Sequence, residues 1–478
     1  TTTATICLFD NVNLALTSNV ASSYVWKATA NTNTTGESTT HQTATTISDV
    51  ITNNTTSVQK VTYTVTPTST AGSCAGTAQT LTITVNPKPA MTSTTSAVIC
   101  SEGTVSIPLT SNVASTTFAW LATDNPNTTG ESITTQNTTT LSNTLTNTST
   151  SVQTVSYTVT PTSPAGCVGN SQTVNVTVNP KPNMTSSNTI AICSGNPVSL
   201  ALSADVTSNF LWLATNNVNT TGESTTNQSS STINDNITNN TNAIQTVTYT
   251  ITPTSTVGSC IGNSQVVNVT VNPTPTLSSS LAPPAICSGT TFNYTALGNV
   301  VGSAFSWTRA SQAGIAESGT SGAPDVSETL TNTSLSDVNV DYVYTSTANG
   351  CSNNQNVVVA ILPSPQGSFT GNTRCAGDNA SFGKLTWTAT AGTGPYTVDY
   401  APGTQANVTS GVAFNLPVAK PIADSTYVLT QVTDNYGCIR TSGFTAGTAT
   451  VVATGTAISI TQGTPATTTT CAGTTTTF

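Results

Sequence analysis

Charge is the first thing that this sequence lacks. Only 6% of its 478 residues are charged, against about 25% in an ordinary soluble domain, and the net charge is −9. The nine Lys and Arg residues are scattered, so they cannot build the positive surface that binds a phosphate backbone. We therefore expect no nucleic-acid partner.

Histidine is nearly absent as well. His41 is the single histidine, and no cysteine or carboxylate cluster lies near it in the sequence. Metal and acid–base chemistry that depends on histidine is thus nearly excluded. We expect no cofactor, no metal site and no catalytic residue, and we expect His41 to be a solvated surface residue.

Long apolar runs and helical periodicity are also missing. No stretch of about 20 apolar residues is present, so we expect no membrane span, and the chain does not open with a basic segment followed by an apolar one. Scarce aromatics, at 5%, could indicate disorder, but disordered chains are poor in β-branched residues too. Here Val, Ile and Thr recur with a period of two, which predicts an all-β fold.

A long internal repeat organises what is present. The segment WKATANTNTTGES at 26–38 returns as WLATDNPNTTGES at 120–132 and as WLATNNVNTTGES at 212–224. The first cysteine of each unit is separated from the next by 93, 93, 94, 88 and 96 residues, at Cys7, Cys100, Cys193, Cys287, Cys375 and Cys471.

Paired prolines separate the units. They remove strand hydrogen-bond donors and fix φ, so each pair ends a strand and forms a short, semi-rigid joint. We expect the sequence to be cut from a longer array, with unit boundaries at 1–87, 88–180, 181–273, 274–364 and 365–458 and the start of a sixth unit at 459–478.

Each unit has the pattern of an immunoglobulin-like β-sandwich. In the second unit Val155, Tyr157 and Val159 share one face while Thr and Ser alternate on the other. About seven such strands in about 93 residues predict a tandem array of these antiparallel sandwiches, forming an elongated rod. The expected core anchors are one Trp per unit and a late-strand Tyr: Trp26, Trp120, Trp212, Trp307, Trp387, Tyr63, Tyr157 and Tyr249.

The eleven cysteines indicate an oxidising compartment, and two pairings fit their spacing. Pairing between neighbouring units gives separations of 24 to 33 residues, from Cys74–Cys100 to Cys438–Cys471. Pairing within units gives separations of 63 to 67 residues and leaves Cys471 to a partner beyond this sequence. We favour the second: Cys7–Cys74, Cys100–Cys167, Cys193–Cys260, Cys287–Cys351 and Cys375–Cys438.

Two further positions recur. Glu37, Glu131 and Glu223 lie in an Asn-Thr-Thr-Gly-Glu-Ser loop, but one carboxylate per loop is too few for calcium, so we interpret the loop as a turn. The motif Ile/Leu-Thr-Asn, preceded by Asp49, Asn143, Asp235 or Glu328, ends a strand in four units. We expect its Asn to close an Asx turn.

These motifs together resemble a known repeat. They are Ile-Cys-Ser-Gly (192–195), one Trp, Tyr-Thr-Val-Thr-Pro-Thr-Ser (157–163), Ala-Gly-Cys (165–167) and Val-Asn-Pro-Lys-Pro (178–182). The chain is similar to the PKD-like, immunoglobulin-like repeats of giant Bacteroidota surface proteins, among them the SprB-type adhesins of gliding motility. The resemblance covers the first four units well, and the fifth is a divergent subtype.

The resemblance implies a stalk or filament segment of an adhesin that is exported by type IX secretion to the bacterial outer-membrane surface. Implied partners are neighbouring repeats, surface glycans or a substratum, and other chains that associate laterally through edge strands. Asp424-Ser425-Thr426 matches the O-glycan site of that phylum, at Ser425. An array of carbohydrate-binding modules on a secreted glycan-active protein stays open as the alternative.

Overall fold

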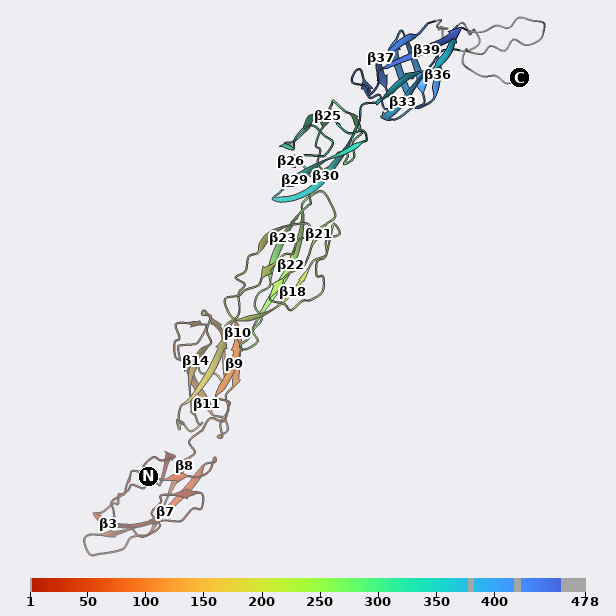
Figure 1. The fold of residues 1–478 in the computed structure, drawn as a ribbon. Helices are drawn as coiled ribbons and strands as arrows, with labels where there is room; N and C mark the ends of the chain where they lie inside the picture. The colour runs from red at the N-terminus through yellow and green to blue at the C-terminus, as the bar shows by residue number, and fades with distance from the viewer. Residues whose placement is uncertain (1, 377–381, 417–422, 457–478) are drawn as a thin grey trace, which may run out of the picture.

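The computed structural model describes residues 2–376, 382–416 and 423–456. Within these residues the regular secondary structure consists of β-strands. The strands form five sandwiches that follow one another along an extended rod (Figure 1). The predicted all-β array of immunoglobulin-like sandwiches is confirmed. The predicted start of a sixth unit, 459–478 with Cys471, lies outside the described residues.

Domain 1 sets the pattern. One sheet has the order β1-β8-β7-β3, and the short pairs β2-β5 and β4-β6 face it. The strands are β1 (Thr3–Cys7), β2 (Leu14–Ala15), β3 (Ser22–Ala28), β4 (Thr34–Thr35), β5 (Thr46–Ile47), β6 (Thr52–Asn53), β7 (Gln59–Ser69) and β8 (Gln79–Asn86).

Domains 2 and 3 repeat this order, with sheets β11-β14-β15-β9 and β16-β23-β22-β18. Domain 2 contains β9 (Ser96–Cys100), β10 (Gly103–Pro108), β11 (Thr117–Ala122), β12 (Thr128–Thr129), β13 (Thr140–Asn147), β14 (Gln153–Thr162) and β15 (Gln172–Asn179). Domain 3 contains β16 (Thr189–Cys193), β17 (Leu200–Ala201), β18 (Ser208–Ala214), β19 (Thr220–Thr221), β20 (Thr232–Ile233), β21 (Thr238–Asn239), β22 (Gln245–Ser255) and β23 (Gln265–Asn272).

Domain 4 keeps the same strand order and adds one edge strand, in the sheet β24-β30-β29-β26-β27. Domain 5 differs: one sheet has the order β32-β39-β37-β34-β35 and the other has the order β31-β33-β36. Domain 4 contains β24 (Ile286–Cys287), β25 (Thr290–Tyr294), β26 (Ala304–Arg309), β27 (Thr320–Gly322), β28 (Val326–Leu330), β29 (Val338–Ala348) and β30 (Cys351–Leu362). Domain 5 contains β31 (Gln366–Gly371), β32 (Thr373–Ala376), β33 (Lys384–Ala391), β34 (Tyr396–Ala401), β35 (Gly403–Val408), β36 (Ala413–Asn415), β37 (Ser425–Thr433), β38 (Ile439–Arg440) and β39 (Thr448–Thr456).

One pairing decides where each first cysteine lies. In domains 1 to 4 the first strand runs parallel to the last strand, so that Cys7 lies opposite Asn86, Cys100 opposite Asn179 and Cys193 opposite Asn272. In domain 4 Cys287 pairs with Leu362. Because parallel strands end at the same edge of a sheet, each of these cysteines lies beside the residue at which the chain leaves the domain.

The predicted core anchors are buried in all five domains. Trp26, Trp120, Trp212, Trp307 and Trp387 are between 0% and 6% exposed. In the first three domains the indole meets the late-strand tyrosine edge-on, with ring centroids 5.7, 5.8 and 5.7 Å apart for Trp26–Tyr63, Trp120–Tyr157 and Trp212–Tyr249. This is the geometry that aromatic pairs prefer.

In domains 1 to 4 the hydroxyl of the core tyrosine is hydrogen-bonded to the residue that lies two positions before the Ile/Leu-Thr-Asn motif. Tyr249 donates to Asp235 at 2.7 Å, and Tyr157 donates to Asn143 at 2.8 Å. The Asp235 carboxylate also accepts the backbone N–H and the hydroxyl of Ser224. Asn143 reproduces the geometry, since its oxygen accepts from Ser132 N–H and its amide donates to Ser132 Oγ.

These tyrosines are poor acids. Burial, followed by the Asp49 carboxylate, raises the pKa of Tyr63 far above its ordinary value, and burial with Asp235 does the same for Tyr249. In domain 4 burial and Glu328 raise the pKa of Tyr342. The phenols therefore stay protonated in the folded chain at a pH at which they ionise in the unfolded chain.

The Asn143 position predicts how Asp235 can be replaced. Asp235→Asn keeps every hydrogen-bond partner, so we expect it to change the stability of domain 3 by less than about 1 kcal/mol. Asp235→Ala leaves a buried phenol and a backbone N–H without an acceptor, so we expect it to destabilise the domain by roughly 2–4 kcal/mol. Hydrogen exchange of β22 in the full chain measures both, with β14 of domain 2 as the internal reference. Equal exchange in the two variants would contradict this role.

The pKa shifts predict an alkaline limit to stability. A raised folded-state pKa gives stability that is complete below the unfolded pKa of about 10 and is lost as the pH rises toward the folded pKa. We expect a constant urea midpoint up to about pH 10 and a falling midpoint above it. Absorbance at 295 nm should show the core phenols ionising only as the chain unfolds; smooth titration of every tyrosine near pH 10 in the folded chain would contradict the burial.

Candidate functional site

The Glu-bearing loops fold as turns that bind their own backbone. Glu131 accepts hydrogen bonds from Asn125 N–H and from Thr128 Oγ1, at 3.4 and 2.7 Å, and the same pair recurs at Glu37 and Glu223. The N–H of the serine that follows each Glu donates to an Asp in domains 1 and 3 but to Asn143 in domain 2. A position that works equally with Asp or Asn does not require a cation.

The Asn of the Ile/Leu-Thr-Asn motif has the structural role that was predicted. In domain 2 the side-chain oxygen of Asn147 accepts from Ser149 N–H at 2.9 Å, which closes an Asx turn. Its amide donates to the carbonyl oxygens of Ser151 and Val178, so it ties the turn to the last strand. Asn53, Asn239 and Asn332 make the same contacts in the other repeats.

Other predicted residues lie apart from any site. His41 is exposed, and Ser425 is half-buried at the start of β37 with its hydroxyl on the Ala423 carbonyl. Among the described residues, no group of three or more His, Cys, Asp or Glu side chains is arranged to hold a metal ion. Over the same part of the chain, no helix is long and apolar enough to cross a membrane.

The disulfides differ from the prediction. They join the first cysteine of one domain to the second cysteine of the next: Cys7–Cys167, Cys100–Cys260, Cys193–Cys351 and Cys287–Cys438. The bridged residues are 151 to 160 positions apart in the sequence. The within-unit pairs Cys7–Cys74, Cys100–Cys167, Cys193–Cys260 and Cys287–Cys351 were wrong, as was Cys375–Cys438, because Cys438 is bonded to Cys287.

Geometry explains the correction. Cys100 lies beside Asn179, where the chain leaves domain 2, whereas Cys167 lies in the turn before β15, at the opposite end of that eight-residue strand. At about 3.3 Å per residue the two cysteines are more than about 20 Å apart, and a disulfide needs Cα atoms within about 7 Å. The alternative Cys74–Cys100 is excluded for the same reason, since those residues lie at the far ends of two successive domains.

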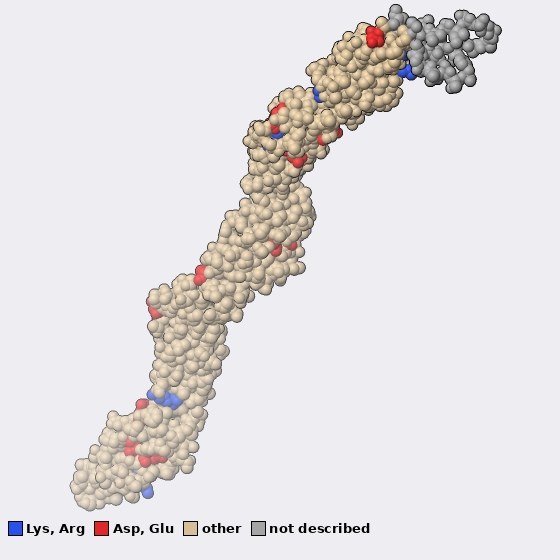
Figure 2. Space-filling view, viewed as in Figure 1, with Lys and Arg blue, Asp and Glu red and all other residues tan. Residues whose placement is uncertain are grey.

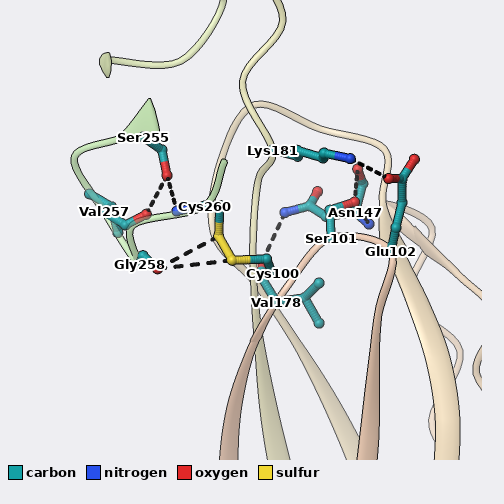
Figure 3. Close-up of a disulfide and its surroundings, with 10 residues drawn as sticks. All are labelled: Cys100, Ser101, Glu102, Asn147, Val178, Lys181, Ser255, Val257, Gly258 and Cys260. Carbon is teal, nitrogen blue, oxygen red and sulfur yellow. Dashed lines mark hydrogen bonds and ion pairs between the residues drawn. A yellow bond between two sulfur atoms is a disulfide. The ribbon is translucent and has the colours of Figure 1, made fainter. Parts of the chain in front are cut away.

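The observed partners meet at facing domain ends. Cys100 at the end of β9 and Cys260 in the turn between β22 and β23 have Cα atoms 5.6 Å apart, and Figure 3 shows their bridge between the two domains. Free Cys74 is exposed in the equivalent turn of domain 1, and Cys375 is itself disulfide-bonded.

In domains 2, 3 and 4 the first cysteine is fixed by the serine that follows it. Ser101 donates its N–H to the Asn179 carbonyl at 2.8 Å, and its hydroxyl accepts the N–H of the buried Asn147 at 3.0 Å. Ser194 and Ser288 make the same two contacts in domains 3 and 4. The Ile-Cys-Ser motif therefore anchors its cysteine to the Asx turn that the buried Asn closes.

Each second cysteine is fixed by a turn that its neighbours build. Ser163 Oγ accepts the N–H of Cys167 and Ser255 Oγ accepts that of Cys260, at 3.2 and 3.0 Å. In domain 5 the Asp434 carboxylate replaces the serine and accepts the N–H of Cys438 at 2.9 Å. In the Cys100–Cys260 bridge both cysteines are therefore held by hydrogen bonds of their own domain.

The joint between domains 2 and 3 is closely packed around the bridge. Gly258 has φ +75°, and a Cβ atom there would lie 2.2 Å from the amide nitrogen of Asn179 across the joint. Only glycine fits, because it alone has no Cβ and adopts positive φ freely. Lys181 of the proline linker forms an ion pair with Glu102 at 2.7 Å beside it (Figure 3).

The joint between domains 4 and 5 is more open. A cavity of about 540 Å³ lies there, between Asp337 and Leu362 on one side and Tyr396 and Asp434 on the other. The Asp434 carboxylate already accepts the backbone N–H groups of Tyr436 and Cys438, so it serves the turn.

Fold and joints together define the class: a tandem array of immunoglobulin-like β-sandwiches, of the disulfide-bonded extracellular type, that are joined end to end. The family model of the PKD-like domain matches residues 4–89, 97–182, 190–275 and 284–365. The chain belongs to the PKD-like domain family. Such repeats are typically structural, non-enzymatic modules of extracellular adhesion or stalk segments, and the match names no catalytic family.

Solved structures give remote likenesses, and no curated protein matches. Titin I67–I69 is 11% identical, with 57% of this chain and 98% of that chain covered and a TM-score of 0.29. Sidekick-1 immunoglobulin domains 1–5 are 10% identical, with 95% and 97% covered and a TM-score of 0.21. Drosophila N-cadherin EC1–4 is 9% identical, with 75% and 99% covered and a TM-score of 0.20.

The pairing predicts the outcome of a single backbone cut. We expect a specific protease site inserted between the exposed Ser187 and Asn188 to leave the cleaved chain at full size on a non-reducing gel, because Cys100–Cys260 spans the cut. Reduction should release two fragments. Cys260→Ser should release them without reductant. Separation of the unsubstituted cleaved chain without reductant would favour the within-unit pairing, and retention in Cys260→Ser would favour pairing between neighbouring cysteines.

Proposed function

We propose that this chain is a stalk segment of a large secreted bacterial cell-surface adhesin. It gives reach and stiffness for surface attachment or gliding motility, and the protein leaves the cell by type IX secretion for the outer-membrane surface. The observation that carries the proposal is the row of five sandwiches with one disulfide across each of four successive joints (Figure 1). A bridge at every joint opposes the bending and twisting that proline linkers alone would allow.

Surface chemistry supports an exposed, passive role. The face in Figure 2 is almost free of charged side chains, and the few present are scattered over the domains. Nine Lys and Arg residues in 478 also leave few cleavage points for trypsin-like proteases. Such a surface suits a spacer that meets many environments and binds little.

The carbohydrate-binding alternative finds no support in the repeated tryptophans. Sugar-binding modules use exposed aromatic rings, and here the repeated Trp120 and Trp212 are 2% and 3% exposed. The proposal keeps three expectations: unit boundaries at 87/88, 180/181, 273/274 and 364/365, an O-glycan at Ser425, and lateral association of chains. Glycan binding that Trp120→Ala abolishes in a folded chain would restore the alternative.

Surface labelling tests the stalk. Antibodies against this chain should label intact cells of the source bacterium as strongly as permeabilised cells, and removal of residues 181–273 from the gene should weaken attachment while labelling persists. Deletion of this unit shortens the reach and leaves Cys100 and Cys351 as the two cysteines at the new joint. Labelling that requires permeabilisation, or attachment that does not depend on the number of units, would contradict the proposal.

A further inference from the structure

We propose that the staggered disulfides give this array a distinct mechanical function. They create two continuous covalent paths that carry tension along the rod through the first and last strands of each domain only. The inner strands, which hold most of the core, are bypassed. The inference concerns the chain itself, and it deepens the proposed stalk function without requiring that the stalk be bacterial or adhesive.

The first path begins at β1. It crosses to domain 2 through Cys7–Cys167, follows β15 to Asn179 and passes along the proline linker into β16 of domain 3. There it crosses through Cys193–Cys351 to domain 4 and follows β30 and the next linker into β31. Residues 8–166 and 194–350 are not part of it.

The second path uses the other bridge at each step. It leaves domain 1 through the linker after Asn86, follows β9 and crosses through Cys100–Cys260 to domain 3. It then follows β23 and the next linker into β24, and crosses through Cys287–Cys438 to domain 5. At every joint one path therefore uses the linker while the other uses the disulfide.

The two paths lie side by side in every central domain. The strands that carry them are neighbours in one parallel ladder, β9 with β15 and β16 with β23, and each ladder contains five residue pairs. In domain 4 the corresponding strands are β24 and β30, with two pairs. Load can thus be shared between the paths through backbone hydrogen bonds along the rod.

Little length is stored in either path. Cys167 and Cys193 are only 26 positions apart in the sequence, although together they span two domains. Much of this segment is already β-strand, which rises about 3.3 Å per residue. A fully extended chain reaches only about 3.3–3.6 Å per residue, so the segment can lengthen very little. Without bridges the whole unit lies in series, and its 93 residues would release roughly 300 Å on unfolding. The bridges prevent the release of that length, because the residues between them do not carry the load.

The paths are also redundant, because they use different disulfides. Loss of Cys100–Cys260 breaks only the second path, and loss of Cys193–Cys351 breaks only the first. A chain that is pulled between two points on the first path should therefore respond to one loss and ignore the other. Replacing the two cysteines of either bridge by serine is chemically the same change. The expected results differ only because the two bridges belong to different paths.

Single-molecule force spectroscopy on the full chain tests this. One handle is attached at the N-terminus, and the other at an azide-bearing residue in place of the exposed Thr370 in β31, so that both lie on the first path. Cys74→Ser is present throughout to prevent dimers through the free, exposed thiol. We expect the oxidised chain to show no extension step of domain length before rupture.

The matched variants are Cys193→Ser/Cys351→Ser and Cys100→Ser/Cys260→Ser. The first pair interrupts the path between the handles, so that the load passes through the 67 residues from Cys100 to Cys167 or an equivalent segment of another domain, and it should introduce at least one step of roughly 200 Å. The second pair should introduce none. Circular dichroism at zero force, with the unsubstituted chain as reference, establishes that both variants are folded.

Domain-length steps in the unsubstituted oxidised chain, or equal steps in the two variants, would overturn the proposal. If a variant does not fold, brief reduction and alkylation of the folded chain opens the bridges instead, and it should convert a step-free trace into one with repeated domain-length steps. Absence of steps after verified reduction would also overturn it. None of these outcomes depends on cell-surface labelling, so this inference and the stalk function can fail separately.

Discussion

The parallel pairing of the first and last strands is the constraint on which the rest of the array depends. It brings the first cysteine of each domain to the residue at which the chain leaves that domain, as with Cys100 and Asn179. The second cysteine lies in the turn at the other end of the last strand. A bridge within one domain is then impossible, because the two sulfurs are separated by the length of a strand. The nearest available partner is the turn of the following domain.

Stability within a domain and cohesion between domains come from separate sets of residues. In domains 1 to 4 the Trp–Tyr pair and the acidic or amide acceptor of the tyrosine hydroxyl close the core. The Ser after the first cysteine and the buried Asn connect that core to the joint, since Ser101 binds both Asn147 and the end of β15. A perturbation at the joint therefore reaches the domain through these few hydrogen bonds.

Much of this could be predicted from the sequence, and the part that could not is instructive. Alternation of Val, Tyr and Thr identifies the strands, and repetition of Trp identifies the core, because both are local patterns that burial imposes. The disulfide pairing was missed because the regular spacing of the cysteines fits pairs at most 67 residues apart, whereas the bridges connect residues 151 to 160 positions apart. Only the parallel register of Cys100 with Asn179 rules out the nearer partners, and that register is a property of the sheet.

The low charge of the chain and its covalent joints suit one another. Ion pairs across a domain joint weaken with salt and contribute little when they are exposed, as Lys181–Glu102 illustrates in its exposed position. A surface of Thr, Ser and Asn offers few other strong contacts between domains. Domains of about 93 residues also have little surface area that can be buried against a neighbour. A disulfide at each joint supplies a connection that neither ionic strength nor interface area controls, so a rod with an uncharged surface can remain continuous in changing surroundings.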